Sequence, residues 1–291
     1  MQIVYHLGAH CTDEDNLVRC LLRNRELLLA EGISVPGPAR YRQLLRDTAA
    51  TLNGRPASAE TTEMVLEQIV EGDGIDRLVL SFESFMAFPR WALGQNMLYP
   101  GATNMTEALV NIFPGHEVEF HLAIRNPATF LPALLGRQKG KSYEEFIEGS
   151  DPLLLRWSNL VRRLRETSPQ APVTVWCDED TPLIWAEVLR EVSGHDPLRQ
   201  LEGTLDVAGA IMSPEGFARM TAYLADHPPQ TEIQRRRIVS AFLDKYALAE
   251  EIEIELDLPG WTEDYVAELT RLYEDDLIEI ARLPGVTFIA P

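Results

Sequence analysis

Basic residues are scarce in this chain of 291 residues, in which 26 lysines and arginines stand against 45 aspartates and glutamates. The formal net charge is −19. Proteins bind nucleic acids and anionic lipids largely through lysine and arginine, which displace counterions from the phosphates. The charge therefore argues against nucleic acid and membrane surfaces as partners, and any phosphate or sulfate site must be a local exception to it.

Cysteines and long apolar runs are also few. The three cysteines, Cys11, Cys20 and Cys177, are odd in number and far apart, which argues against a disulfide framework and favours a reducing compartment. No apolar run approaches the roughly 18–20 residues that a membrane span needs. The first six residues lack the basic segment and apolar stretch of a signal peptide. We therefore expect a cytoplasmic protein.

Short apolar runs alternate with helical patterns along the first two thirds of the chain. They predict strands at 3–7, 77–82, 117–124 and 172–176, which indicates an α/β fold with a mostly parallel sheet flanked by helices. The last hundred residues are predicted to be mainly helical. In that part, acidic and apolar residues alternate over 251–258, which predicts a strand with one face exposed to solvent. The segment 286–289 predicts a short strand that returns to the sheet. We find no internal repeat and no dividing linker, so we expect one domain over 1–291 with a helical extension at about 200–285.

The strongest functional clue is the tight loop between the first strand and the first helix. Its residues are Gly8, Ala9, His10, Cys11 and Thr12. The N–H groups at the start of a helix are a ready site for an anion. The arrangement therefore suggests that a negatively charged group binds at this loop.

This loop resembles that of the P-loop sulfotransferases that use 3′-phosphoadenosine 5′-phosphosulfate (PAPS), above all bacterial members with the pattern H-x-G-x-H-K-T-G-T-[TS]-x-L. Five residues fall on matching slots: His6, Gly8, His10, Thr12 and Leu17. Further landmarks follow in the same order up to about residue 194, namely Asn24-Arg25, Gly32-Ile33, Ser81-Phe82-Glu83, Arg125-Asn126-Pro127 and Cys177-Asp178-Glu179-Asp180. The resemblance implies a P-loop-type sheet, with PAPS held by residues 8–12 and by Arg125.

The departures from the family pattern concern the charges that would hold PAPS. Cys11 stands where the family has its loop lysine, and Asp13, Glu14 and Asp15 stand where it has a glycine and two hydroxyl residues. At an effective dielectric of about 20, two like charges about 4 Å apart repel by about 4 kcal/mol. The family's serine for the 3′-phosphate is replaced by Ala133, which cannot donate a hydrogen bond. We therefore expect that the loop no longer binds PAPS and that no cofactor is bound. The chain would then be a non-catalytic homologue with a binding or regulatory role toward an unknown small molecule or protein.

The same acidic residues also have a purely structural interpretation. Thr12 is a favoured N-cap residue, and Asp15 three residues later suggests a capping box. Acidic residues in a first turn complement the helix dipole. This interpretation predicts a helix that begins at about Asp13.

Two other functions stay open. The first is an active sulfotransferase that transfers sulfuryl from PAPS to a hydroxyl or amine, with substitute anion contacts from Arg125, Arg137, Lys139 and backbone amides. Glu83 is then the candidate base for the acceptor, and His10 and Cys11 are further catalytic candidates. The second is a thiol or metal activity centred on Cys11, which has histidines nearby. We expect no metal site. The stretch 85–99, which is rich in aromatic residues and methionine, is either an apolar acceptor pocket or simply core.

Overall fold

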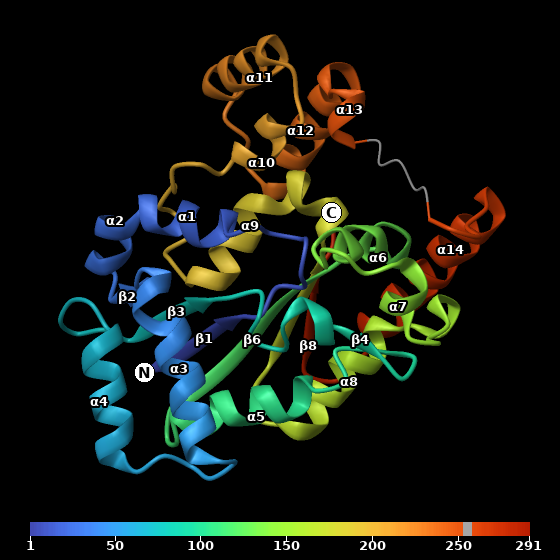
Figure 1. Ribbon diagram of the computed structural model, residues 1–291. Coiled ribbons are helices and arrows are strands. Elements are labelled where there is room, and N and C mark those ends of the chain that lie inside the picture. The colour runs from blue at the N-terminus through green and yellow to red at the C-terminus, as the bar shows by residue number, and fades with distance from the viewer. Residues whose placement is uncertain (253–257) are drawn as a thin grey trace.

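The computed structural model describes residues 1–252 and 258–291. Six strands form the central sheet in the order β2-β3-β1-β6-β7-β8, and every neighbouring pair is parallel (Figure 1). The strands are β1 (Gln2–His6), β2 (Ile33–Ser34), β3 (Arg77–Ser81), β6 (Glu117–Ile124), β7 (Val173–Cys177) and β8 (Val286–Ile289). The predicted α/β class is confirmed, and 286–289 does return to the sheet as the neighbour of β7.

Helices fill most of the chain between the strands. They are α1 (Asn16–Arg23), α2 (Arg25–Ala30), α3 (Pro38–Leu52), α4 (Ala59–Ile69), α5 (Ala102–Ile112), α6 (Pro127–Gly136), α7 (Tyr143–Ile147), α8 (Trp157–Thr167), α9 (Thr181–Ser193), α10 (Asp206–Ala210), α11 (Pro214–Asp226), α12 (Glu232–Tyr246), α13 (Ala249–Ile252) and α14 (Glu263–Ile280). A small hairpin, β4 (Leu93–Gly94) and β5 (Met97–Leu98), precedes α5.

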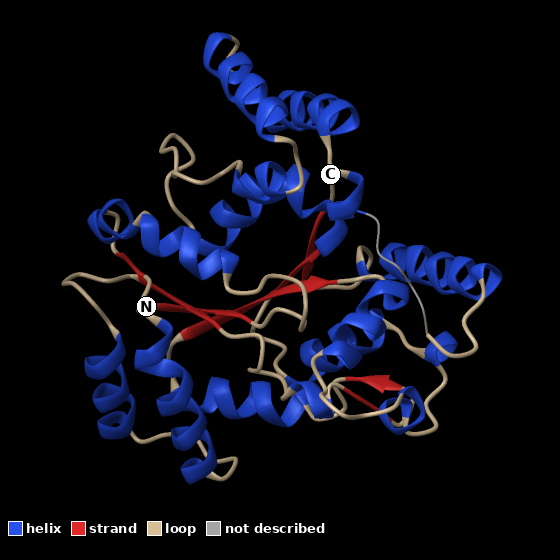
Figure 2. Cartoon of the chain, turned by 45° about the horizontal axis from the view of Figure 1, so that its top comes forward, coloured by secondary structure: helices blue, strands red, loops and turns tan. Residues whose placement is uncertain are grey.

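Two layers of helices cover the sheet (Figure 2). Successive side chains of a strand point to opposite faces, and in β1 this sends Tyr5 to one core and Val4 to the other. The Tyr5 core includes buried residues of α3, α5 and α8, whereas the Val4 core includes those of α1, α2 and α9. Since β1 is buried on both faces, it is a short apolar run, as is usual in parallel sheets.

The C-terminal part is helical, as predicted. Helices α10, α11 and α12 surround a small core of Ala208, Met212, Met220 and Val239, while α14 packs against α6 and α8 of the main body. The strand predicted at 251–258 is wrong at its start, because residues 251 and 252 belong to α13, whose first turn the acidic side chains favour. Residues 253–257 of that prediction lie outside the described residues. No helix in the described part of the chain is long and apolar enough to cross a membrane.

The strand order places a crevice at the end of β1. From β1 the chain first builds β2 and β3 on one side, and only later adds β6 on the other side. In open α/β sheets, ligands bind outside the carboxyl ends of the strands at such a reversal of order. The segments that follow β1 and β6 therefore frame the candidate site.

Candidate functional site

The predicted loop is present, but it is longer than expected. It runs from residue 7 to residue 15, and backbone bonds from Leu7 N to His121 O (2.8 Å) and from Ala9 N to Ala123 O (3.0 Å) tie its start to β6. Gly8 has φ 49°, and three non-glycine residues, Cys11, Glu14 and Asp15, also have positive φ. Such conformations end regular structure and are uncommon for residues with a Cβ. The helix therefore begins at Asn16, and the predicted start at about Asp13 is wrong.

The predicted cap is also wrong. The Thr12 hydroxyl donates to Ala9 O at 2.7 Å instead of accepting from the helix, and Asp15 makes no side-chain cap bond. Asp13 satisfies the helix start instead, because its Oδ1 accepts from Leu17 N at 2.8 Å. A carboxylate of the protein itself thus lies where the start of a helix would otherwise bind an external anion.

His10 is fully buried and is fixed by Tyr99. The Tyr99 hydroxyl lies 2.9 Å from His10 N, from which it accepts, and 2.8 Å from His10 Nδ1. The ring nitrogen and the hydroxyl can each be the donor in the second contact, and Ser84 Oγ lies 3.5 Å from the other ring nitrogen, Nε2. Burial, with a contribution from Arg137, lowers the pKa of His10 to about 4. An imidazole with so low a pKa is neutral at pH 7 and is a weak base.

Arg125 lies at the end of β6, as the resemblance implied, and lines the crevice. Its Nη1 donates to Cys11 O at 2.6 Å and its Nε donates to Thr129 Oγ1 at 3.0 Å. Asp178 is 4.0 Å away. Arg125 therefore supports the loop from within. The expected serine slot, Ala133, lies on α6 and supplies no hydroxyl.

Neither Arg137 nor Lys139 lines the crevice that Arg125 lines. Arg137 Nη1 lies 2.6 Å and 2.9 Å from the two carboxylate oxygens of Glu83, and its Nη2 lies 3.1 Å from Glu14 Oε1. The charge of Arg137 is thus shared between two acids, and both oxygens of the candidate base Glu83 are occupied. Lys139 is exposed, and it lines a shallow surface hollow together with Arg137, Arg90 and Lys141.

The crevice itself is a cavity of about 370 Å³ between the ends of β1, β6 and β7 and the starts of α1 and α9. Asp13, Asp178 and Glu179 face it together with Arg125 and the indoles of Trp176 and Trp185. Burial raises the pKa of Asp13 to about 7 and that of Asp178 to about 8. Burial therefore opposes the ionisation of both groups, and where they do ionise, at higher pH, their charge repels a phosphate group.

Cys11 is buried and carries no sign of activation. Burial raises the pKa of its thiol to about 11, so the group is protonated at neutral pH, whereas a reactive cysteine needs the thiolate. Across residues 1–252 and 258–291, no group of three or more histidine, cysteine or acidic side chains has the arrangement of a metal site. His6 is hydrogen bonded through Nδ1 to Ser81 Oγ at 2.9 Å and is stacked on Trp176.

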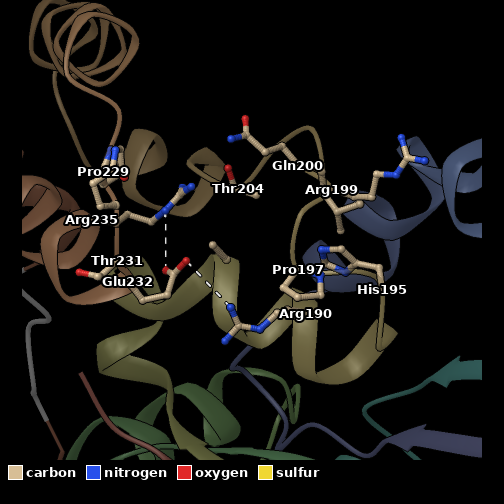
Figure 3. A pocket seen from close by; sticks show the side chains of 13 residues that line it. Arg190, His195, Pro197, Arg199, Gln200, Thr204, Pro229, Thr231, Glu232 and Arg235 are labelled. Carbon is tan, nitrogen blue, oxygen red and sulfur yellow. Dashed lines mark ion pairs between the residues drawn. The ribbon is translucent and has the colours of Figure 1, made fainter.

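A second, polar cavity of about 360 Å³ lies between the end of α9 and the start of α12 (Figure 3). Glu232 stands between two arginines there, 4.0 Å from Arg190 and 3.7 Å from Arg235 (Figure 3). Arg235 and Glu232 therefore lie on a salt-bridged face of α12. The cavity contains none of the residues predicted to form a site, and its cations already share a carboxylate.

Two residues that hold the loop were not predicted. Tyr99 fixes His10, and Arg42 of α3 pairs with Asp15 through two bonds while also donating to Ser81 O. Both are distant in sequence from the loop. The sequence shows only a tyrosine in an aromatic-rich stretch and an arginine in a predicted helix. Nothing in either pattern indicates which residue of the loop it contacts.

No protein-family model matches the chain, and no curated protein matches it. Among solved structures, a sulfotransferase from Alicyclobacillus acidocaldarius aligns with 82% of this chain and 97% of its own length, at 13% identity and a TM-score of 0.36. An identity and a TM-score this low establish neither a family nor a function for this chain. The α/β fold class follows from the parallel strand pairs of the sheet.

Proposed function

We propose that this chain is a sulfotransferase-like protein that does not use PAPS and acts as a binding or regulatory protein. The observation that carries the proposal is the bond from Leu17 N to Asp13 Oδ1 at the start of α1. In the resembled family, the donors of this region hold the phosphosulfate. Here a carboxylate of the chain holds a donor at the helix start, and an incoming anion would have to displace it or lie against it.

The cations of the site support the same conclusion. Arg137 is shared by Glu83 and Glu14, and Arg125 donates to the Cys11 carbonyl. An active transferase with substitute contacts would have to free both arginines and then bring the cofactor past Asp13 and Asp178. Charged hydrogen bonds contribute about 1.5–3 kcal/mol each, so exchanging them for bonds to a ligand brings little net gain.

The test is calorimetric titration of the protein with adenosine 3′,5′-bisphosphate, the desulfated product of PAPS, with PAPS itself in a second titration. We expect no saturable heat at millimolar ligand. Circular dichroism on the same sample verifies that the protein is folded. A micromolar dissociation constant for either nucleotide would overturn the proposal and would favour the active sulfotransferase, whose acceptor would then have to be sought.

A further inference from the structure

A cavity of about 650 Å³, larger than the crevice, shares no lining residue with it but borders the loop through Arg42, which pairs with Asp15. It is enclosed by α3, by α5 and by the segment that follows β3. Its walls are mostly apolar and include Phe82, Phe85, Met86, Phe88, Trp91 and Met105. Its volume is typical of sites that enclose a small molecule. The stretch 85–99 therefore supplies both core and cavity wall, while Tyr99 belongs to the His10 contact instead.

Parts of this wall are exposed to solvent. Phe88 keeps 37% and Trp91 keeps 52% of its surface accessible, and the two rings lie 5.9 Å apart. Removing a large aromatic side chain from water is favourable in free energy, and a ring that stays exposed does not gain this contribution. Such a pair at the edge of an apolar cavity is therefore well suited to cover an apolar molecule.

Among the described residues that line the cavity, only two are charged. They are Arg42 and Arg46, two arginines one turn apart on α3. Arg42 lies 4.6 Å from the Phe82 ring centre, but it is committed to Asp15 and Ser81. Arg46 lies 5.1 Å from the Phe88 ring centre and bonds to the Gln43 amide. Within the described residues, Arg46 has no carboxylate partner, and no acidic side chain lines this cavity. In a chain with a net charge of −19, this is an uncompensated cation beside an apolar hollow.

We propose that this cavity binds an apolar small molecule that ends in a carboxylate group, with its body among the aromatic side chains and its carboxylate on Arg46. The inference rests on the proposed function, because it assigns a ligand to a protein that binds and does not transfer. The planar guanidinium matches a carboxylate through two parallel bonds. Arg46 also lies against the Phe88 ring, so its guanidinium is held at the edge of the apolar wall.

The experiment compares ligands that differ only in their polar end. Decanoate and 2-naphthoate are titrated calorimetrically against decan-1-ol and 2-naphthol at neutral pH. We expect at least one acid to bind with a micromolar dissociation constant, and at least tenfold more tightly than its alcohol. Equal affinities of acid and alcohol, or no binding by any of the four, would overturn the inference.

Three variants locate the site. Arg46→Gln should weaken the acid at least tenfold and leave the alcohol unchanged, whereas Arg55→Gln, an exposed arginine beyond α3 that does not line the cavity, should change neither. Ala50→Trp fills the cavity from an exposed helix position and should weaken both ligands. Unchanged acid binding in Arg46→Gln would contradict the proposal.

The outcomes separate this inference from the proposed function. If the bisphosphate does not bind and the acids do not bind either, only the ligand assignment fails. If the bisphosphate binds with micromolar affinity, the proposed function fails whatever the acids do.

Discussion

The guanidinium of Arg137 grips both carboxylate oxygens of Glu83, at 2.6 Å and 2.9 Å, and reaches Glu14 with its other nitrogen. This three-residue bridge joins the loop after β1, the segment after β3 and the end of α6. It holds the loop in place and commits the Arg137 guanidinium to two carboxylates.

Releasing Arg137 should therefore restore part of an anion site. In the double variant Glu83→Gln with Glu14→Gln, we expect the affinity for adenosine 3′,5′-bisphosphate to rise at least tenfold, about 1.4 kcal/mol. The control is Glu60→Gln with Glu63→Gln, two exposed acids of α4, which changes the net charge equally. Titration calorimetry of the two variants distinguishes them, and an equal rise in both would show a general charge effect in place of a local one.

Rebuilding the loop is the stronger intervention. Glu14 and Asp15 have positive φ, where a β-branched residue would be strained, so we choose Cys11→Lys, Asp13→Gly, Glu14→Gly and Asp15→Asn. These changes add one positive charge and remove three negative charges, and they free Leu17 N. We expect bisphosphate binding at least tenfold tighter than wild type, in a manner that weakens with added salt.

Asp13→Asn is the matched control for the rebuilt loop, because its amide oxygen can still accept from Leu17 N. It should gain much less affinity. If the rebuilt protein remains folded by circular dichroism and binds no better than wild type, the crevice itself excludes the nucleotide.

The buried acids of the crevice should make stability depend on pH. The pKa of Asp13 is about 7 in the folded protein against an ordinary value of 3.8. Between these values the folded protein keeps a proton that the unfolded chain has released, so its stabilising contribution is complete below about pH 4 and is lost as the pH rises through 7. The slope is at most about 1.4 kcal/mol per pH unit for one proton.

We therefore expect the melting temperature to fall between pH 5 and pH 8, with Asp178 acting in the same direction. Asp13→Asn should flatten this dependence and should melt at a higher temperature than wild type at pH 8. Asp73→Asn, at an exposed turn, should leave the dependence as in wild type. A wild-type melting temperature that rises over this range would show that Asp13 is charged in the folded protein.

Asp276 of α14 should be the most sensitive single residue of the C-terminal part. It is 3% exposed, and its Oδ2 accepts from Trp157 N at 2.6 Å and from Ser158 N at 3.1 Å, at the start of α8. Removing the acceptor leaves buried donors unpaired, so Asp276→Ala should lower the free energy of unfolding by about 2–4 kcal/mol. Urea denaturation measures this, with the exposed neighbour Asp275→Ala as control, for which we expect at most about 0.5 kcal/mol. Equal effects of the two changes would contradict the cap.

Local sequence patterns predicted the framework well. The strand 117–124 has the predicted bounds, because it is a self-contained apolar run. The helix after the first loop was predicted too early, since Asp13, Glu14 and Asp15 have the composition of a first turn. What decides their conformation is a set of distant partners, Arg42 and Arg137.

The candidate site was predictable only in part, for the same reason. The loop residues and Arg125 could be found because they follow strands, where parallel sheets gather their ligand-binding groups. The sequence does not predict the pair of Glu83 and Arg137, because the two residues are 54 positions apart. In a chain with many acids, Arg137 has many other possible partners.

The Tyr99 hydroxyl bonds to both the amide and the ring of His10 across 89 positions of sequence. Tyr99 itself follows the β4–β5 hairpin, and its carbonyl accepts from Arg163 of α8. The His10 amide can exchange its hydrogen with solvent only when its bond to the Tyr99 hydroxyl breaks. The hydrogen-exchange rate of this single amide therefore reports how often the loop and the tyrosine separate.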